Sequence, residues 1–472
     1  MSILKSYHEL VKSKKLKENS RIELILRTRP VRSLSGIVNI SVLTKAYKCP
    51  GKCIFCPIEK DLPKSYLSGE PAVERAKKLK FNPYLQVKKR IEMLEKEGHP
   101  TDKIELRVVG GTWSYYPRTY QNWFIKRCFE ACNAKNSKSL LEAQKINEKT
   151  NHRIIGLSIE TRPDFINEGE IKHLRELGVT LVELGVQSTY DDVLSTNRRG
   201  HSREQTIAAT KMLKDSGFKV LYQMMPNLAG STLAKDKNMF QELFKNSDFQ
   251  PDYLKIYPCA LIKGTKLYSL WKNKKYSPYT EKELISLVKE IKKIVPPYVR
   301  IQRITRDIPA QSIAAGPAKL TNLRQVLTNS MEKEGWRCGC IRCREIKGNY
   351  NPKEKLYLSK IEYGASGGKE IFLSFEDKTK RKLHSLLRLR LIDGKAFIRE
   401  VHTFGQMQSI TSQKEKSPQH KGLGKKLIKE AEKIAKKNKS KMMIVISGVG
   451  VRGYYKKLGY KLKDTYMVKS LR

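Results

Sequence analysis

The chain has 472 residues, which is enough for about three domains and a sizeable hydrophobic core. Its 94 Lys and Arg against 47 Asp and Glu give a net charge of +47, far beyond solubility needs, which favours a polyanionic partner and nucleic acid first. The polar start predicts no signal peptide, no stretch is long enough to span a bilayer, and clustered cysteines argue against a disulfide framework, so we expect a cytoplasmic protein without membrane contact.

Residues 1–35 are predicted to form a basic amino-terminal arm with little apolar periodicity. A run of cations is usually a solvated, partly helical tail. It can also follow a phosphate backbone, where each cation neutralises a phosphate and releases a counterion. The segment alone supports both interpretations equally.

From residue 36 short β-branched runs alternate with amphipathic helical stretches. We expect strands over residues 37–43, 104–109, 154–159, 181–186, 220–224, 254–257 and 299–304. We expect helices over residues 72–97, 120–132, 168–177, 204–216, 236–244 and 281–294. This alternation predicts a parallel sheet, and six or more units predict a complete or partial TIM-like α/β barrel over residues 36–307. Active sites of that architecture lie at the carboxyl ends of the strands.

The loop after the first strand carries Cys49, Cys53 and Cys56 in the spacing CxxxCxxC. Three thiolates can hold one 4Fe-4S cluster, and its fourth iron stays open to the amino and carboxylate groups of S-adenosylmethionine (SAM). Zinc and a disulfide are the alternatives, but a structural zinc site needs four ligands and no fourth Cys or His lies nearby. With Phe55 before the last cysteine, the loop resembles the signature of radical SAM enzymes, which use the cluster to cleave SAM to a 5′-deoxyadenosyl radical.

Gly110 and Gly111 follow the second strand, where the missing Cβ atoms let a ligand approach the backbone amides. A bare Gly-Gly pair is also typical of a tight turn. Because radical SAM enzymes have a glycine-rich segment here that meets the amino group of SAM, we expect Gly110 and Gly111 to bind SAM.

Charged residues end the third and fourth strands. Such charges are costly to bury unless they are paired or bound to a ligand, so we expect Glu160 and Arg162 to hold the ribose and carboxylate of SAM. Glu183 and Gln187 follow the same pattern on the next strand. We therefore predict that they lie in the barrel and add to the SAM site.

A linker over residues 308–350 carries Cys338, Cys340 and Cys343 in the spacing CxCxxC. A second iron–sulfur cluster is one interpretation. A closed zinc site fits a domain junction better, because it stabilises a region whose local core is thin. The fourth zinc ligand could be Cys259, His201 or a neighbour of the first cysteine cluster.

Residues 351–472 are predicted to form a second, α+β domain. Strands are expected over residues 357–363, 370–375, 386–391, 396–403 and 442–446, with a helix over residues 426–435. Gln419, Gly422 and Gly424 form a QxxGxG motif that would offer free backbone amides and the helix dipole to a pyrophosphate. The order of these elements resembles GNAT acetyltransferases, which bind acetyl-CoA this way. Tyr454 and Tyr455 are either packing aromatics or, as in GNAT folds, residues that reach the thioester.

A radical SAM barrel joined through a cysteine-rich linker to a GNAT domain resembles the family of the Elongator catalytic subunit, which modifies the wobble uridine of tRNA. The strings that carry this resemblance are Cys-Pro-Gly-Lys-Cys-Ile-Phe-Cys-Pro, Gly-Gly-Thr-Trp, Ile-Glu-Thr-Arg-Pro-Asp, Gly-Val-Gln-Ser, Asp-Ser-Gly-Phe-Lys-Val, Arg-Asp-Ile-Pro, Gln-His-Lys-Gly-Leu-Gly and Val-Ile-Ser-Gly-Val-Gly. The compact CxxxCxxC is similar to prokaryote-type members. The short amino-terminal arm departs from eukaryotic members and argues against a place in a large multi-subunit complex.

The resemblance implies that SAM and acetyl-CoA are co-substrates and that a tRNA anticodon stem-loop is modified at carbon 5 of its wobble uridine. The deoxyadenosyl radical would take hydrogen from the acetyl methyl group, the carbon radical would add to the base, and thioester hydrolysis would leave 5-carboxymethyluridine. The target base is expected to flip out of its stack. The cluster also needs an electron donor, and the sequence leaves open whether the chain acts alone or as a homodimer.

The family also implies residue roles. Cys49, Cys53, Cys56, Lys103 and Tyr455 would be catalytic. Contacts to acetyl-CoA would come from Lys103, Glu400, Val401, His402, Thr403, Leu423, Gly424, Lys425 and Tyr455. Because Lys103 belongs to the barrel, the two domains would face each other across one cleft. Two alternatives remain: a protein lysine acetyltransferase with the barrel as a scaffold, and a non-catalytic tRNA-binding module.

Overall fold

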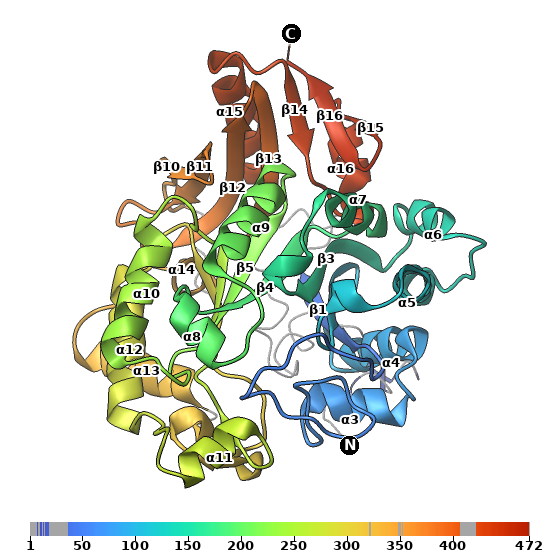
Figure 1. Cartoon of the computed structure of the whole chain (residues 1–472). Coiled ribbons are helices and arrows are strands. Elements are labelled where there is room, and N and C mark those ends of the chain that lie inside the picture. Colours follow the sequence, from blue (N-terminus) through green and yellow to red (C-terminus); the bar gives the residue numbers. More distant parts are fainter. Residues whose placement is uncertain are drawn as a thin grey trace.

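The computed structural model describes residues 36–320, 322–347, 351, 353–405 and 422–471, with residues 7, 10, 11, 13 and 15–17 of the amino-terminal segment. Most of the predicted arm and Gln419 therefore lie outside the described residues. The described chain forms two seven-stranded sheets, each with its own helices, and the carboxyl-terminal sheet lies above the amino-terminal one in Figure 1. None of the described helices is long and apolar enough to cross a membrane.

The amino-terminal sheet is entirely parallel, in the order β1-β2-β3-β4-β5-β6-β8. Its strands are β1 (Ile37–Leu43), β2 (Lys103–Val109), β3 (Arg153–Thr161), β4 (Leu181–Gln187), β5 (Lys219–Met224), β6 (Tyr253–Ile256) and β8 (Arg300–Arg303). All seven were predicted to within two residues at each end. Because β1 and β8 are the edges of the sheet, the barrel is partial rather than complete.

Helices cover the outside of this sheet, as expected when parallel strands are joined by crossovers. They are α3 (Pro71–Lys78), α4 (Pro83–Lys96), α5 (Arg118–Asn133), α6 (Leu140–Asn147), α7 (Glu168–Leu177), α8 (Asp191–Thr196), α9 (Arg203–Asp215), α10 (Leu233–Lys245), α11 (Lys266–Lys272) and α12 (Glu281–Ile294). Polar caps set the start of several of them. Ser202, for example, accepts a hydrogen bond from the backbone N–H of Gln205, and the Gln205 side chain accepts one in return.

The single helix predicted over residues 72–97 is wrong, because the chain forms two helices there, α3 and α4. Lys80 and Phe81 between them have left-handed backbone angles (φ 49° and 54°). Pro83 disfavours helical backbone in the residue before it, and Asn82 accepts a hydrogen bond from Leu85 N–H to begin α4.

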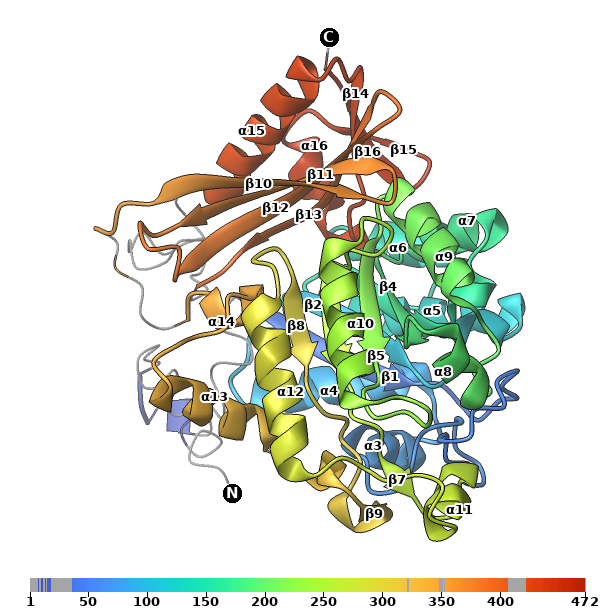
Figure 2. The ribbon, with the colours of Figure 1, turned by 60° about the vertical axis from the view of Figure 1, so that its left-hand side comes forward.

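The junction between the sheets contains β7 (Leu261–Ile262) paired with β9 (Ile313–Ala315), followed by α13 (Leu323–Lys333) and α14 (Ile341–Arg344). In Figure 2, α13 and α14 lie beside α12 and below the carboxyl-terminal sheet. The predicted linker is thus a structured segment that packs against the barrel.

The carboxyl-terminal sheet has the order β10-β11-β12-β13-β14-β16-β15 and is antiparallel except for the parallel pair β13–β14. Its elements are β10 (Tyr357–Ala365), β11 (Gly368–Glu376), β12 (Leu383–Ile392), β13 (Lys395–Thr403), α15 (Leu423–Lys437), β14 (Met442–Val445), α16 (Arg452–Lys456), β15 (Lys461–Lys463) and β16 (Tyr466–Ser470). Figure 2 shows α15 on the face of this sheet that points away from the barrel. Alternate residues of β11 accordingly pack in two cores, Ile371 beneath α15 and Phe372 in the core shared with the barrel.

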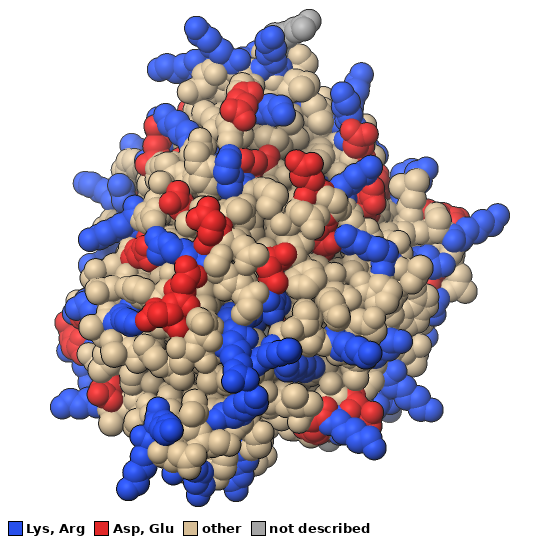
Figure 3. Space-filling view, viewed as in Figure 1, with Lys and Arg blue, Asp and Glu red and all other residues tan. Residues whose placement is uncertain are grey.

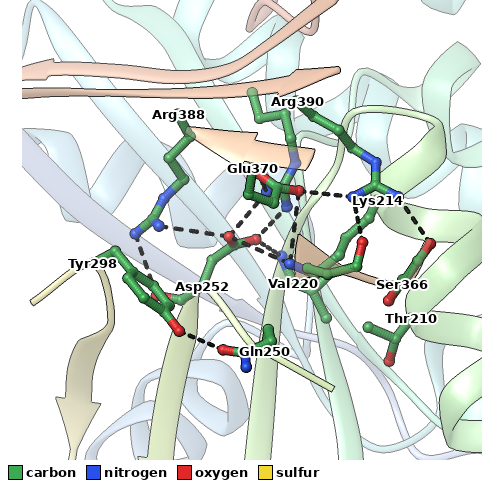
Figure 4. A network of polar contacts seen from close by, with 12 residues as sticks. Thr210, Lys214, Val220, Gln250, Asp252, Tyr298, Ser366, Glu370, Arg388 and Arg390 are labelled. Atoms are coloured by element: carbon green, nitrogen blue, oxygen red, sulfur yellow. Dashed lines mark hydrogen bonds and ion pairs between the residues drawn. The ribbon is translucent and has the colours of Figure 1, made fainter. Parts of the chain in front are cut away.

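A buried ionic network joins the two halves (Figure 4). The carboxylate of Asp252, which immediately precedes β6, accepts hydrogen bonds from both terminal nitrogens of Arg399 in β13. One of these hydrogen bonds is 3.0 Å long. Arg399 also donates to Glu370 of β11 at 2.9 Å, and Arg388 donates to the backbone oxygen of Asp252 at 3.3 Å. These side chains are almost fully buried, so each charge depends on its partners from the other half.

Candidate active site

Cys49, Cys53 and Cys56 all line one cavity of about 300 Å³ at the carboxyl end of the parallel strands. They lie on the loop that leaves β1, as the sequence predicted. A Cβ atom on Gly51 would lie 2.9 Å from an Arg162 guanidinium nitrogen, so the glycine lets Arg162 approach the loop. The loop therefore folds closely over its basic neighbours.

Two guanidinium groups surround the cysteine loop. Arg199 donates to the Cys53 sulfur at 3.4 Å, and one buried terminal nitrogen of Arg162 has no hydrogen-bond partner in the part of the chain that the structure describes. Burial raises the pKa of Cys56 to about 12, so a thiolate there needs compensating positive charge. Three sulfurs on one loop, with cations behind them, fit a cluster that takes three thiolates.

The two glycines after β2 differ in their surroundings. A Cβ atom at Gly110 would lie 2.0 Å from the Thr44 hydroxyl oxygen, and its φ of 131° suits glycine alone, so local packing requires this residue. Gly111 lines the cavity, whereas Gly110 does not.

Glu160 and Arg162 both line the cavity. Glu160 accepts hydrogen bonds from Tyr66 at 3.0 Å and from Gln223 at 3.2 Å. Arg162 makes two 2.8 Å hydrogen bonds to Asp164, and so one side of its guanidinium is already occupied. The remaining free nitrogen points toward the cysteine loop.

Glu183 does not line the cavity but lies behind its wall, with 1% of its side chain exposed. It accepts hydrogen bonds from Lys255 and, at 3.0 Å, from Arg107. Burial alone would raise the pKa of Glu183, but these two cations lower it to about 2. Gln187 lines the cavity with a left-handed backbone (φ 70°) and a buried amide oxygen that has no hydrogen-bond partner.

Sequence reasoning missed the polar side chains that complete this wall. They are Tyr66, Arg107, Gln223, Lys255, Arg303 and Arg306. The sequence signal for such a residue is a single polar side chain inside an otherwise apolar strand, such as Lys255 in β6. Burying this side chain is costly unless it pairs with another group. A single Lys in a four-residue strand gives no indication of which carboxylates it meets.

A second cavity of about 1170 Å³ lies between the two halves. It is lined by Lys103 from β2 and by Tyr455 from α16, so these two predicted residues share one cleft. Ser41, Arg107 and Arg303 line both this cavity and the smaller one. The two cavities therefore share a wall inside the parallel sheet.

The parting of β13 and β14 forms one side of this cleft. Their pairing ends at Ile398 and Val445, and β13 continues to Thr403 paired with β12 on its other side. The amino terminus of α15 lies at the opening, because a Cβ atom on Gly424 would be 3.3 Å from the Tyr454 hydroxyl and 3.8 Å from that of Thr403. Gly422 at the N-cap has no side chain, and no other side chain in the described part of the chain caps α15, so its first backbone N–H groups are available to a ligand.

The other predicted cleft residues have distinct surroundings. Glu400 accepts from Arg388 at 2.8 Å and from the Tyr253 hydroxyl, and although burial raises its pKa, nearby Lys219 and Arg388 lower it to about 2. Burial lowers the pKa of His402 to about 4, and its buried Nε2 has no hydrogen-bond partner among the described residues. Val401, Thr403, Gly422 and Lys425 also line the cleft, whereas Leu423, the first residue of α15, is buried and does not line it.

The second cysteine group is compact. The sulfurs of Cys338, Cys340 and Cys343 lie within 4.8 Å of one another, the one group of three possible metal ligands this close in the described part of the chain. A tetrahedral zinc with 2.3 Å bonds holds its sulfurs about 3.8 Å apart. The sulfurs of Cys49, Cys53 and Cys56 do not all lie within 4.8 Å of one another. A 4Fe-4S cluster that binds one sulfur on each of three irons requires this wider spacing.

Neither named candidate for a fourth ligand joins this group. Cys259 is buried in a separate apolar cluster with Tyr276, and His201 lies 3.2 Å from the backbone oxygen of Val186. Both expectations are wrong, because the loops that carry them lie by the barrel opening. Lys292 approaches the group instead, with its nitrogen 3.8 Å from the Cys343 sulfur.

Comparisons with known proteins agree with this geometry. Residues 43–243 match the Radical SAM superfamily, and residues 251–333 match the Radical_SAM C-terminal domain. The chain is 49% identical to a tRNA uridine(34) acetyltransferase of Methanocaldococcus infernus, covering 99% of this chain and 91% of the relative. It is 43% identical to a protein of the same name from Dehalococcoides mccartyi, covering 93% and 99%.

The human protein named Elongator complex protein 3 is 38% identical, over 95% of this chain and 86% of its own length. The solved structure of the archaeal Methanocaldococcus infernus Elp3 with N-terminus deletion (1-46) superposes with a TM-score of 0.81 and 46% identity, covering 93% of this chain and 100% of that one. The similarity thus extends across both sheets.

Proposed function

The chain belongs to the family of the tRNA uridine(34) acetyltransferases and Elongator complex protein 3, and from this membership we propose that it modifies the wobble uridine of tRNA. It is a radical SAM enzyme and an acyltransferase. Its net charge of +47 suits a polyanionic substrate. The same proposal places it in the cytoplasm, with an electron donor for its cluster.

The smaller cavity is the proposed SAM site. When bound, a 4Fe-4S cluster on Cys49, Cys53 and Cys56 supplies the electron that cleaves SAM and so generates the radical that activates the acetyl methyl group. Arg162 and Arg199 offset the thiolate charge, while Lys255 and Glu160 present a cation and a carboxylate to the polar groups of SAM.

The larger cavity is the proposed acetyl-CoA site, in a carboxyl-terminal domain of the GNAT type. The support is the parting of β13 and β14, with the uncapped amino terminus of α15 at the gap, where a pyrophosphate would find free N–H groups. Lys103 of β2 and Tyr455 of α16 line this cleft from the two halves of the molecule. The product of this reaction would be 5-carboxymethyluridine.

The observation that carries the proposal is the wall that the two cavities share. Arg107 and Arg303 border both of them, so a group bound in the larger cleft can approach a group bound among the cysteines. A protein lysine acetyltransferase with a scaffold barrel would have no use for two ligand sites that share a wall. A non-catalytic tRNA-binding module would not need the buried ion pairs around Lys255.

A zinc ion is the proposed ligand of Cys338, Cys340 and Cys343. Their close spacing and the neighbouring Lys292 suit thiolates on one small cation. Its place next to α13 and α14 would stabilise the junction between the two halves.

The proposal is tested with tRNA, SAM, acetyl-CoA and a reductant under anaerobic conditions. Mass analysis of the digested nucleosides should show 5-carboxymethyluridine at the wobble position. Cys53→Ser should abolish it, because one cluster ligand is lost, whereas Cys128→Ser, a buried cysteine outside both cavities, should retain it. Peptide lysine acetylation without any modified nucleoside would support the protein acetyltransferase instead.

A further inference from the structure

A stack of aromatic rings adjoins the cysteine loop. Tyr47, two residues before Cys49, packs its ring 4.9 Å from that of Tyr116 at an interplanar angle of 27°. Tyr116 in turn stacks on Tyr120 at 5.1 Å and 22°. Three rings thus lie nearly parallel beside the loop that carries Cys49.

The inner part of this stack is held rigidly. Tyr116 is 5% exposed, and its hydroxyl donates to the backbone oxygen of Lys45 at 2.8 Å. The Tyr120 hydroxyl accepts from the backbone N–H of Lys45 at 3.2 Å. The stack is therefore anchored to the chain that leaves β1, and its position relative to the cysteines is set by the backbone.

The outer end of the stack is open to solvent. Tyr47 is 39% exposed, and Tyr115, whose ring lies 6.1 Å from that of Tyr47, is also 39% exposed. Large aromatic rings placed side by side at a surface usually mark a binding site. Trp123, whose ring lies 5.6 Å from that of Tyr120, is 44% exposed at the far end of the stack, so Tyr47 is the exposed end that lies next to the cysteine loop.

Cations surround the open rings. Lys45, Lys48 and Lys52 are exposed on the same loop, and the Lys45 nitrogen lies 5.2 Å from the centre of the Tyr120 ring. In Figure 3, Lys and Arg side chains gather at the centre of the face where this loop crosses in Figure 1, between α8 and α3. Aromatic rings for bases, together with cations for phosphates, are the combination by which proteins bind unpaired nucleotides.

We propose that the exposed ring of Tyr47 is a stacking platform for an unpaired base of the RNA, beside the base that enters the cavity. This inference rests on the proposed function, because the substrate loop must reach the cysteine side of the barrel. The lysines on either side of Tyr47 contact the phosphates next to the stacked base. The platform thereby sets which nucleotide faces the cavity.

The test is the affinity for an anticodon stem-loop RNA with uridine at the wobble position. Tyr47→Leu should weaken binding by about 5- to 150-fold, the range measured for loss of one base–aromatic stack. Tyr47→Trp should bind as the wild type, since it keeps a flat ring. Tyr357→Leu is the matched control, because Tyr357 is 42% exposed with a lysine nitrogen 5.6 Å from its ring but lies on β10 of the other sheet.

Salt dependence separates stacking from charge. Tyr47→Leu should leave the slope of log affinity against log salt unchanged, whereas Lys48→Gln should reduce it by about 1. A 2-aminopurine base in the loop should lose fluorescence on the wild type and keep it on saturated Tyr47→Leu. The inference would be overturned if Tyr47→Leu bound the RNA with wild-type affinity and still quenched the 2-aminopurine fluorescence. It would also be overturned if Tyr47→Trp lost as much RNA affinity as Tyr47→Leu.

Other outcomes separate this inference from the proposed function. Unchanged RNA affinity in Tyr47→Leu with slower cluster reduction by a flavodoxin, but not by dithionite, would make the rings a docking site for an electron donor and overturn the RNA platform. If the wild type forms 5-carboxymethyluridine while Tyr47→Leu binds the RNA with wild-type affinity, the inference about Tyr47 is wrong and the proposed function stands. If stacking depends on Tyr47 and no modified nucleoside forms, the platform stands and the proposed function fails.

Discussion

Two regions of the molecule bury a lysine between two carboxylates: the ionic network that joins the halves and the wall of the smaller cavity. Lys214 in the network and Lys255 in the wall have 0% and 1% of their side chains exposed. Burial lowers the pKa of Lys214 to about 8, whereas the pKa of Lys255 is raised, because contact with Glu183 outweighs the effect of burial. The two environments thus act in opposite directions on the same residue type.

Direct contact explains the difference. Lys255 hydrogen-bonds to Glu183 and lies 3.3 Å from Glu160. Lys214 lies 3.9 Å from Asp252 and 3.8 Å from Glu370 and makes no hydrogen bond, since arginines already occupy those carboxylates (Figure 4). The buried charges of the network are therefore closed between two sheets, whereas Lys255 and Glu160 line the smaller cavity.

The largest effect is expected from Asp252→Asn in the network. The change leaves Arg399 and Lys214 without the carboxylate that they share, and removing one partner of a buried ion pair typically costs about 3–5 kcal/mol. Urea unfolding should show this loss in the free energy of unfolding. A loss below about 1 kcal/mol would mean that the network does not join the halves.

The pH dependence of stability should come next in size. The pKa of Lys214 is about 8 in the folded chain and 10.5 in the unfolded chain, so the unfolded chain binds more protons between these values and stability rises with pH there. Relative to Lys214→Met, the wild type should gain about 2 kcal/mol between pH 7.5 and 9.5. Unfolding free energies at both pH values measure this, and parallel curves for the two proteins would contradict it.

The third prediction compares the two lysines directly. Lys255→Met should lower the rate of 5′-deoxyadenosine formation by about 10- to 150-fold, the value of one hydrogen bond to a charged group. Lys214→Met should change this rate less than twofold per folded molecule, because it lies outside both cavities. Equal losses in both variants would show that the network takes part in catalysis.

The smallest effect is expected from an exposed pair. Lys235 lies 2.5 Å from Asp192, with 36% and 62% of their side chains exposed. Surface ion pairs contribute about 0–1 kcal/mol, so Lys235→Met should change the free energy of unfolding by less than about 1 kcal/mol. A larger change would mean that pairing, rather than burial, decides the cost of removing a lysine.

Much of the barrel and its first motif could be predicted from the sequence. The seven parallel strands follow from short β-branched runs, and the loop of Cys49, Cys53 and Cys56 follows from their spacing. The break between α3 and α4 was missed although Pro83 is visible, because the amphipathic pattern continues across it. The strands β15 and β16 were missed because they are short and interrupted by turns.

The polar partners in the cavities could not be predicted. Lys255 meets Glu160 and Glu183 only because β3, β4, β5 and β6 are neighbours in the sheet. The fourth ligand of the proposed zinc site could not be predicted either, because neither Cys259 nor His201 lies near Cys338. Partners distant in the sequence depend on sheet order and loop path, which periodicity does not contain.

By itself, the sequence determined the element order, the cysteine spacings, the basic charge and the resemblance to a tRNA-modifying family, because these depend on local patterns along the chain. Only the tertiary structure decided that Arg107 and Arg303 border both cavities and that Tyr47 extends an ordered stack of rings. Such contacts arise where separate strands and loops converge, and their geometry is a property of the packed molecule.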